Sequence, residues 1–307
     1  MQASVVAHCD WSLDGQKRFM TVSTRIGARF HVSVPEPVGD TASLVERLQA
    51  RARTQGPLLL GFDFPIGLPR IYGERTGFPS FRALMDELGT GRWSDWFKVA
   101  TEREEISLTR PFYPARPGGT LRRHLFEALD MQGADLLRLC EQPGEGRQTP
   151  AMLFWTLGGN QVGKAAITGW REVIMPNRAR IGLWPFDGAL MDLLARHAVV
   201  MAETYPGDAY GQIGIPRRPV WSKRRQDGRR SVAPFLQGWI ASRPHVEADA
   251  LLPVIADGFG ADKVGEDRFD SAVGLFAMLD VLTGKRPEGA PDRPDVRLWE
   301  GWILGRL

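Results

Sequence analysis

The chain has 307 residues, 43% hydrophobic and 24% charged, and its formal net charge at pH 7 is +3. This size and composition exclude a disordered or fibrous protein and are typical of a globular chain of one large or two smaller domains. The two cysteines fit neither a disulfide framework nor a zinc site, and without an apolar run of roughly 20 residues or a signal-peptide pattern we expect a cytoplasmic protein with no membrane partner.

The first 66 residues predict the opening of a mixed α/β sheet. Residues 3–9, 17–25 and 28–34 are β-rich and separated by turn signals, which is typical of an antiparallel meander. Between 40 and 55 the apolar residues fall on one helical face, with Asp40 as the expected N-cap. The nearly continuous apolar run at 57–63 then predicts a strand that is covered on both faces.

Residues 67–197 lack sheet alternation and predict a large, mainly helical insertion. Helical patterns occupy 80–88, 93–105, 121–130 and 160–174. The strand pattern returns at 198–206, and helices are predicted at 232–242, at 248–259 and from about Asp267 onward. The last of these helices directs four side chains toward the core, namely Phe269, Val273, Phe276 and Leu279. The tail from 285 is charged and Pro-rich, with a short closing element at 297–304.

Carboxylates stand at the ends of three predicted strands and at the start of the last helix. The strand-end acids are Asp10, Asp63 and Glu203, and the helix contributes Asp267 and Asp270. If one sheet edge gathers them, their mutual repulsion pushes each toward protonation, and a divalent cation such as Mg²⁺ or Mn²⁺ relieves it. Taken singly, the same acids also suit helix caps and strand-end turns, and that alternative stays open.

A basic segment follows the Glu203 strand and predicts phosphate binding. We expect Lys223, Arg224 and Arg229 to contact phosphate and Trp221 to stack on a base. The alternative is a solvated loop that leads into the next helix. A second group of cations lies in the helical insertion, at Arg110, Arg116, Arg122 and Arg123.

Four short blocks in this order, DWS, FDFPIGLP, ETYPGDAY and DRFDSA, resemble the domain of unknown function 429 family, which is described as predicted RNase H-like nucleases. The resemblance spans most of the chain and implies a five-stranded mixed sheet with helices around it and the first three strands antiparallel. We expect a single domain over 1–284, with its core in 1–66 and 198–284, and the helical insertion between the fourth and fifth strands is longer than a minimal RNase H core carries. Residues 285–307 are then a C-terminal tail.

The resemblance also implies the site residues. Asp10, Asp63 and Asp270 are the implied metal ligands, with Asp267 or Glu203 as a fourth. The terminal DxxD followed by a small residue also looks like the end of Holliday-junction resolvases.

The leading functional expectation is hydrolysis of phosphodiester bonds in DNA or RNA by a carboxylate-held two-metal mechanism, with Asp10, Asp63, Glu203 and Asp270 as catalytic residues. One alternative is a non-catalytic nucleic-acid or nucleotide-binding protein whose acids hold a structural ion. Another is an ATP-using phosphotransferase of the actin and sugar-kinase type. That architecture needs a glycine-rich phosphate hairpin after the first strand, where this chain has only Gly15.

Overall fold

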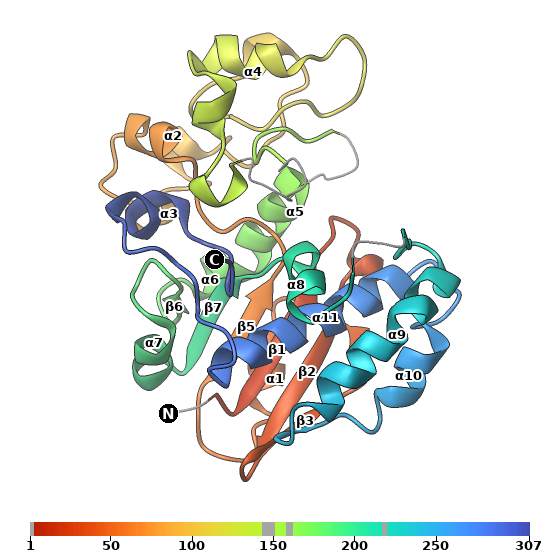
Figure 1. Cartoon of the computed structure of the whole chain (residues 1–307). Coiled ribbons are helices and arrows are strands. Elements are labelled where there is room, and N and C mark those ends of the chain that lie inside the picture. The colour runs from red at the N-terminus through yellow and green to blue at the C-terminus, as the bar shows by residue number, and fades with distance from the viewer. Residues whose placement is uncertain (1–2, 143–150, 158–161, 217–219) are drawn as a thin grey trace. The chain divides into compact units, whose positions relative to one another are not determined.

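The computed structural model describes residues 3–142, 151–157, 162–216 and 220–307 (Figure 1). The chain divides into two compact units. Unit 1 comprises Met1–Asp63, Arg178–Gly289 and Ile303–Leu307, and unit 2 comprises Phe64–Asn177 and Ala290–Trp302. In this division the first segment of unit 2 ends at Asn177, and residues 178–197, which we assigned to the helical insertion, add a strand and a helix to unit 1. The predicted tail is likewise divided between the two units.

Unit 1 is built on a mixed sheet with the strand order β6-β7-β5-β1-β2-β3-β8, and β4 pairs with β2. The strands β1, β2 and β3 form an antiparallel meander, while β5 runs parallel to both β1 and β7. The five predicted strands are thus confirmed. Three further strands contain only two residues each, which is too short to leave a hydrophobic pattern in the sequence. The strand bounds are Val5–Asp10 (β1), Phe19–Ile26 (β2), Arg29–Val32 (β3), Glu36–Pro37 (β4), Leu58–Phe62 (β5), Gly182–Leu183 (β6), Val199–Glu203 (β7) and Val246–Glu247 (β8).

The central strands are buried along their whole length. Every residue of β1, β5 and β7 is buried, as expected for strands that helices cover on both faces. The helix α11 (Gly265–Leu282) lies across β5, β1 and β2 in Figure 1. Its four predicted core residues, Phe269, Val273, Phe276 and Leu279, are all fully buried.

The remaining helices of unit 1 are α1 (Leu44–Gln49), α7 (Leu190–Arg196), α8 (Pro206–Gln212), α9 (Gln226–Ala241) and α10 (Leu252–Asp257). The N-cap position of α1 is Ser43 rather than the predicted Asp40. The Asp40 carboxylate instead accepts the backbone N–H groups of Ala42 at 3.3 Å and Ser43 at 3.0 Å. It therefore stabilises the turn that leads into the helix, and the helix itself is shorter than its pattern predicted.

Unit 2 is mainly helical, as predicted, and has an aromatic core in which Trp96 and Trp170 stack at 5.2 Å. Its α-helices are α2 (Arg70–Arg75), α3 (Phe81–Met85), α4 (Arg122–Leu129), α5 (Val162–Gly169) and α6 (Met175–Asn177). Two π-helical turns lie at Trp170–Ile174 and Val296–Glu300. Four 3-10 turns lie at Gly91–Trp93, Arg103–Glu105, Gly133–Leu136 and Leu139–Glu141. A further 3-10 turn, Gly15–Lys17, belongs to unit 1. The start of the predicted helix at 160–161 lies outside the described residues.

The predicted helix at 93–105 is wrong. The backbone N–H of Ala100 donates to the carbonyl of Phe112 at 2.7 Å, and the N–H of Ala115 donates to the carbonyl of Ala100 at 2.8 Å. This pairing with a distant segment replaces the local i to i−4 bonds that a helix needs. None of the helices within the described ranges combines the length and the apolar character that crossing a membrane requires.

Candidate functional site

The register of two parallel strands places Asp10 beside Asp63. Cys9 of β1 is paired with Phe62 of β5, so the next residue of each strand stands at the same carboxyl edge and on the same face of the sheet. The two carboxyl groups are hydrogen-bonded to each other, and Asp63 also accepts the backbone N–H of Trp11 at 2.7 Å. The Trp11 ring is fixed by the guanidinium of Arg18, 4.2 Å from its centroid.

Burial shifts the titration of this pair upward. It raises the pKa of Asp63 to about 7, although the hydrogen bonds from Trp11 and Asp10 oppose the shift. The pKa of Asp10 lies well above its usual range because of burial first and the charges of Asp63 and Asp270 second. The pair therefore retains a proton near neutral pH when no cation is present.

Asp270 faces a cation and a phenol. One of its carboxylate oxygens accepts the hydroxyl of Tyr210 on α8, and the other accepts the ammonium of Lys223 at 2.6 Å. Lys223 also lies 3.1 Å from Glu266. Burial raises the pKa of Asp270, and the charge of Lys223 is the largest influence in the opposite direction.

Asp267 stands one helical turn before Asp270. Burial, and next the charges of Glu266 and Asp270, raise its pKa to about 6. Its Oδ2 atom is buried and has no hydrogen-bond partner among the described residues. The N-cap position of α11 is Val264, so neither aspartate caps this helix.

Glu203 ends β7 at the same sheet edge, but its register differs. It is paired with Phe62, one position before Asp63. Because neighbouring residues of a strand point to opposite faces, its side chain belongs to the face opposite to Asp63. The structure therefore does not bring Glu203 to the other predicted ligands.

The basic segment is mostly engaged by the protein itself. Arg229 is 2% exposed, and its guanidinium donates to the carbonyls of Lys223, Gly258 and Gly260. It therefore holds the loop and presents no free face to a substrate, contrary to the prediction. Arg224 is exposed, and it forms no ion pair with any of the described residues.

The predicted base-stacking residue, Trp221, packs within the protein. Its ring lies 5.4 Å from Tyr210 and 5.7 Å from Phe269, and its indole N–H donates to the carbonyl of Pro216 at 3.1 Å. Tyr205 is 38% exposed, and burial, followed by the charge of Asp208, raises the pKa of its phenol, on which the charges of Lys223 and Asp270 also act. Sequence reasoning missed both tyrosines, although the ETYPGDAY block contains them. The contact of Tyr210 with Asp270 spans 60 positions, so spacing alone could not reveal it.

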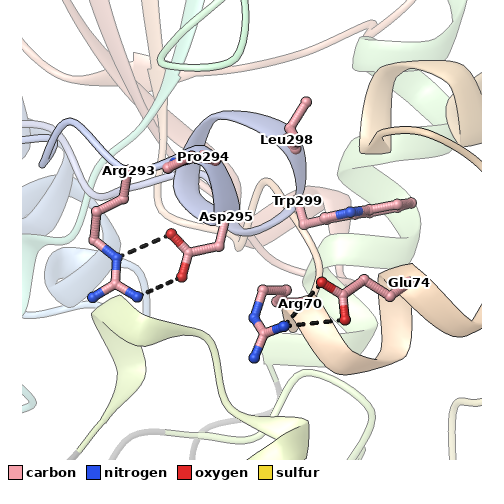
Figure 2. A pocket seen from close by; sticks show the side chains of 7 residues that line it. All are labelled: Arg70, Glu74, Arg293, Pro294, Asp295, Leu298 and Trp299. Atoms are coloured by element: carbon pink, nitrogen blue, oxygen red, sulfur yellow. Dashed lines mark hydrogen bonds and ion pairs between the residues drawn. The ribbon is translucent and has the colours of Figure 1, made fainter.

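Two surface hollows lie in unit 2. The first, of about 390 Å³, has Arg70 and Arg293 in its wall, and each is already paired with a nearby carboxylate, Glu74 or Asp295 (Figure 2). The second, of about 420 Å³, contains a hydrogen bond of 2.9 Å between Tyr113 and His124, and it is lined by Arg103 and Arg116 together with Glu102 and Glu104. Neither hollow offers the uncompensated positive charge that phosphate binding needs.

The donor chemistry of the unit 1 carboxyls fits a hard divalent cation. Asp10 is buried and Asp63 is half-buried beside it, and within the described ranges neither carboxylate forms an ion pair, while Asp267 adds an oxygen without a hydrogen-bond partner there. No group of three or more His, Cys, Asp or Glu side chains within the described ranges is arranged to hold a metal ion. Asp270 would complete such a group, but Tyr210 and Lys223 engage both of its oxygens. A metal at this site thus requires Asp270 to exchange partners.

Comparisons of the chain with known protein families, with curated proteins and with solved structures found no match.

Proposed function

We propose that the protein hydrolyses phosphodiester bonds of nucleic acid in a reaction that depends on a divalent metal, and that it is an RNase H-like member of the domain of unknown function 429 family. The observation that carries the proposal is the hydrogen-bonded pair of Asp10, which is buried, and Asp63, which is half-buried, at the carboxyl ends of adjacent parallel strands. The strand order β3-β2-β1-β5-β7 supports the proposed fold, because the antiparallel meander adjoins the parallel strands through β1.

Asp10 and Asp63 would hold Mg²⁺ or Mn²⁺ together with Asp270, and Asp267 would be the fourth ligand in preference to Glu203. Such an ion supplies charge neutralisation at the phosphate and a lowered pKa for water. The Tyr210 hydroxyl positions Asp270 through its hydrogen bond. Arg224 would attract the phosphate backbone, and Tyr205, rather than Trp221, would stack on a base.

The test compares three variants on single-stranded and duplex DNA and RNA with Mg²⁺ or Mn²⁺. Asp10→Asn and Asp63→Asn should abolish hydrolysis, whereas Glu203→Gln, on the other face of the sheet, should retain it if the variant is folded. Thermal melting checks the fold of all three. Loss of activity in Glu203→Gln with retention in Asp63→Asn would overturn the assignment.

One observation favours a second candidate function. The ion pair between Lys223 and Asp270 already neutralises part of the acid cluster, which a protein that binds nucleic acid or nucleotide without cleaving it would tolerate. In that case, binding would persist in Asp63→Asn and no tested nucleic acid would be cleaved by the wild-type protein.

A further inference from the structure

The ammonium group of Lys223 lies beside the carboxylates, where we expect a bound metal cation. Its ammonium is 2.6 Å from Asp270 and 3.1 Å from Glu266, two carboxylates that lie one turn apart on α11. The side chain of Asp270 is 5% exposed and that of Lys223 is 39% exposed. A buried carboxylate thus takes its counter-charge from a lysine that still reaches solvent.

The backbone of Lys223 is anchored by contacts that are separate from those of its ammonium group. The buried guanidinium of Arg229 binds the Lys223 carbonyl and also the carbonyls of Gly258 and Gly260, which joins this loop to the segment before α11. Gly228 keeps the loop close, since a Cβ atom there would lie 2.2 Å from the carbonyl oxygen of Ser222. The flexible four-carbon stem of lysine therefore pivots from a fixed point.

Lysine is a suitable exchangeable partner for Asp270. Its ammonium is a compact, strongly hydrated charge, and the side chain is partly exposed. Moving this ammonium from Asp270 into water therefore costs less free energy than breaking the contacts of a buried guanidinium would. A divalent cation brings twice the charge and accepts several oxygen ligands at once, whereas the ammonium of Lys223 carries one charge and contacts only Asp270 and Glu266 among the described carboxylates. Both cannot occupy the same oxygen of Asp270.

We propose that Lys223 is a resident counter-ion that competes with the divalent cation for Asp270 and is released toward solvent when the cation binds. The proposal rests on the proposed function, because it assigns the same carboxylates to the metal. The released ammonium then stands beside the acid cluster, where a phosphate group is its natural partner. Lys223 thereby becomes a positioning and phosphate-binding residue only in the metal-bound protein.

The first test measures Mn²⁺ binding to the full chain at pH 8 by the EPR signal of free Mn²⁺. Lys223→Gln should lower the Mn²⁺ dissociation constant by about tenfold or more, which corresponds to about 1.4 kcal/mol. Lys223→Arg, which keeps the charge, should remain near wild type. The control Lys263→Gln makes the same charge change at an exposed position before α11, and it should leave the dissociation constant within about twofold of wild type, since a surface charge that is not in contact contributes little.

The second test uses the wild-type protein, so it does not depend on the folding of a variant. Limited acetylation by acetic anhydride, followed by mass spectrometry, should label Lys223 faster when Mg²⁺ is added, while Lys263 should keep its rate. An unchanged or slower rate at Lys223, in protein that binds the metal, would overturn the proposal.

The outcomes separate this proposal from the function on which it rests. If wild type binds Mn²⁺ and Lys223→Gln binds it no more tightly, the competition is wrong and the metal site stands. If only Lys223→Gln binds Mn²⁺, the competition is right, and the wild-type protein is not a metal-dependent hydrolase. If neither protein binds Mn²⁺, both proposals fail.

Discussion

At the scale of single residues, the candidate site shows which parts of a site strand patterns can predict. Asp10 and Asp63 were predictable because each follows a buried apolar run, and parallel strands end at one edge. Glu203 was not, because a shift of one position in the register moves a side chain to the other face. The contact of Lys223 with Asp270 joins positions 47 apart and arises only from the packing of α11 beside the basic loop.

The first prediction concerns the stability cost of the carboxyl pair. In excess chelator, Asp63→Asn should stabilise the protein, and the gain should grow between pH 5 and pH 8. The folded-state pKa of Asp63, about 7, lies above its usual 3.8. Its contribution to stability is therefore complete below about pH 4 and is lost as the pH rises through about 7, whereas asparagine stays neutral throughout. Urea unfolding at both pH values measures the difference.

The exposed Asp14→Asn is the control for this experiment, and it should show no such gain. A stabilisation of Asp63→Asn that is equal at both pH values would contradict the shifted titration.

The second prediction compares two neighbouring arginines. Arg229→Met removes the donor for three backbone carbonyls and should lower the free energy of unfolding by about 2 kcal/mol or more, since hydrogen bonds from charged groups are worth roughly 1.5 to 3 kcal/mol each. Arg230→Met removes a half-exposed pair with Asp257 and should cost no more than about 1 kcal/mol. Equal losses in chemical denaturation would mean that Arg229 does not hold the loop.

At the scale of elements, long apolar patterns predicted the strands and α11 well, while short elements depended on tertiary contacts. α11 was predictable because Phe269, Val273 and Phe276 recur at helical spacing and all become buried. The 93–105 segment has similar spacing at Trp93 and Trp96, yet its backbone pairs with residues 112–115. Side-chain periodicity does not reveal such backbone pairing.

The third prediction tests how closely α11 approaches β1. A Cβ atom on Gly274 would lie 2.2 Å from the His8 ring, whereas nothing lies within 4 Å of a Cβ atom on Gly238 of α9. Gly274→Ala should therefore destabilise the protein by about 1 to 3 kcal/mol through overpacking. Gly238→Ala should stabilise it by about 0.5 to 1 kcal/mol through helix propensity. If thermal melting shows that both substitutions stabilise the protein, the close approach is wrong.

At the scale of the whole molecule, composition predicted a globular chain and the strand and helix patterns predicted an α/β fold, but neither predicted the division into two units. Residues 178–197 join unit 1 because the two-residue strand β6 pairs with β7, and a strand of that length has no pattern to detect. The net charge of +3 is also uninformative about binding. Among the described cations of the basic segment, Lys223, Arg225, Arg229 and Arg230 have partners within the protein, and Arg224 is exposed.

The fourth prediction concerns this surface charge. Arg224→Glu should weaken binding to single-stranded DNA and reduce the slope of log affinity against log salt by about one unit, because one phosphate contact is lost. The matched variant Arg225→Glu changes an exposed residue that is paired with Asp227, and its effect on the slope should be smaller. If both variants have the same salt-dependence slope as wild type, the loop is solvated and does not contact phosphate.

The central claim is that the carboxyls of unit 1 hold a divalent metal. The most direct measurement is anomalous scattering from crystals soaked in Mn²⁺. The account predicts an anomalous peak bounded by Asp10, Asp63 and Asp270, with the ammonium of Lys223 moved away from Asp270. Fully soaked crystals with no peak there, or with Lys223 still bonded to Asp270 and the metal elsewhere, would contradict it.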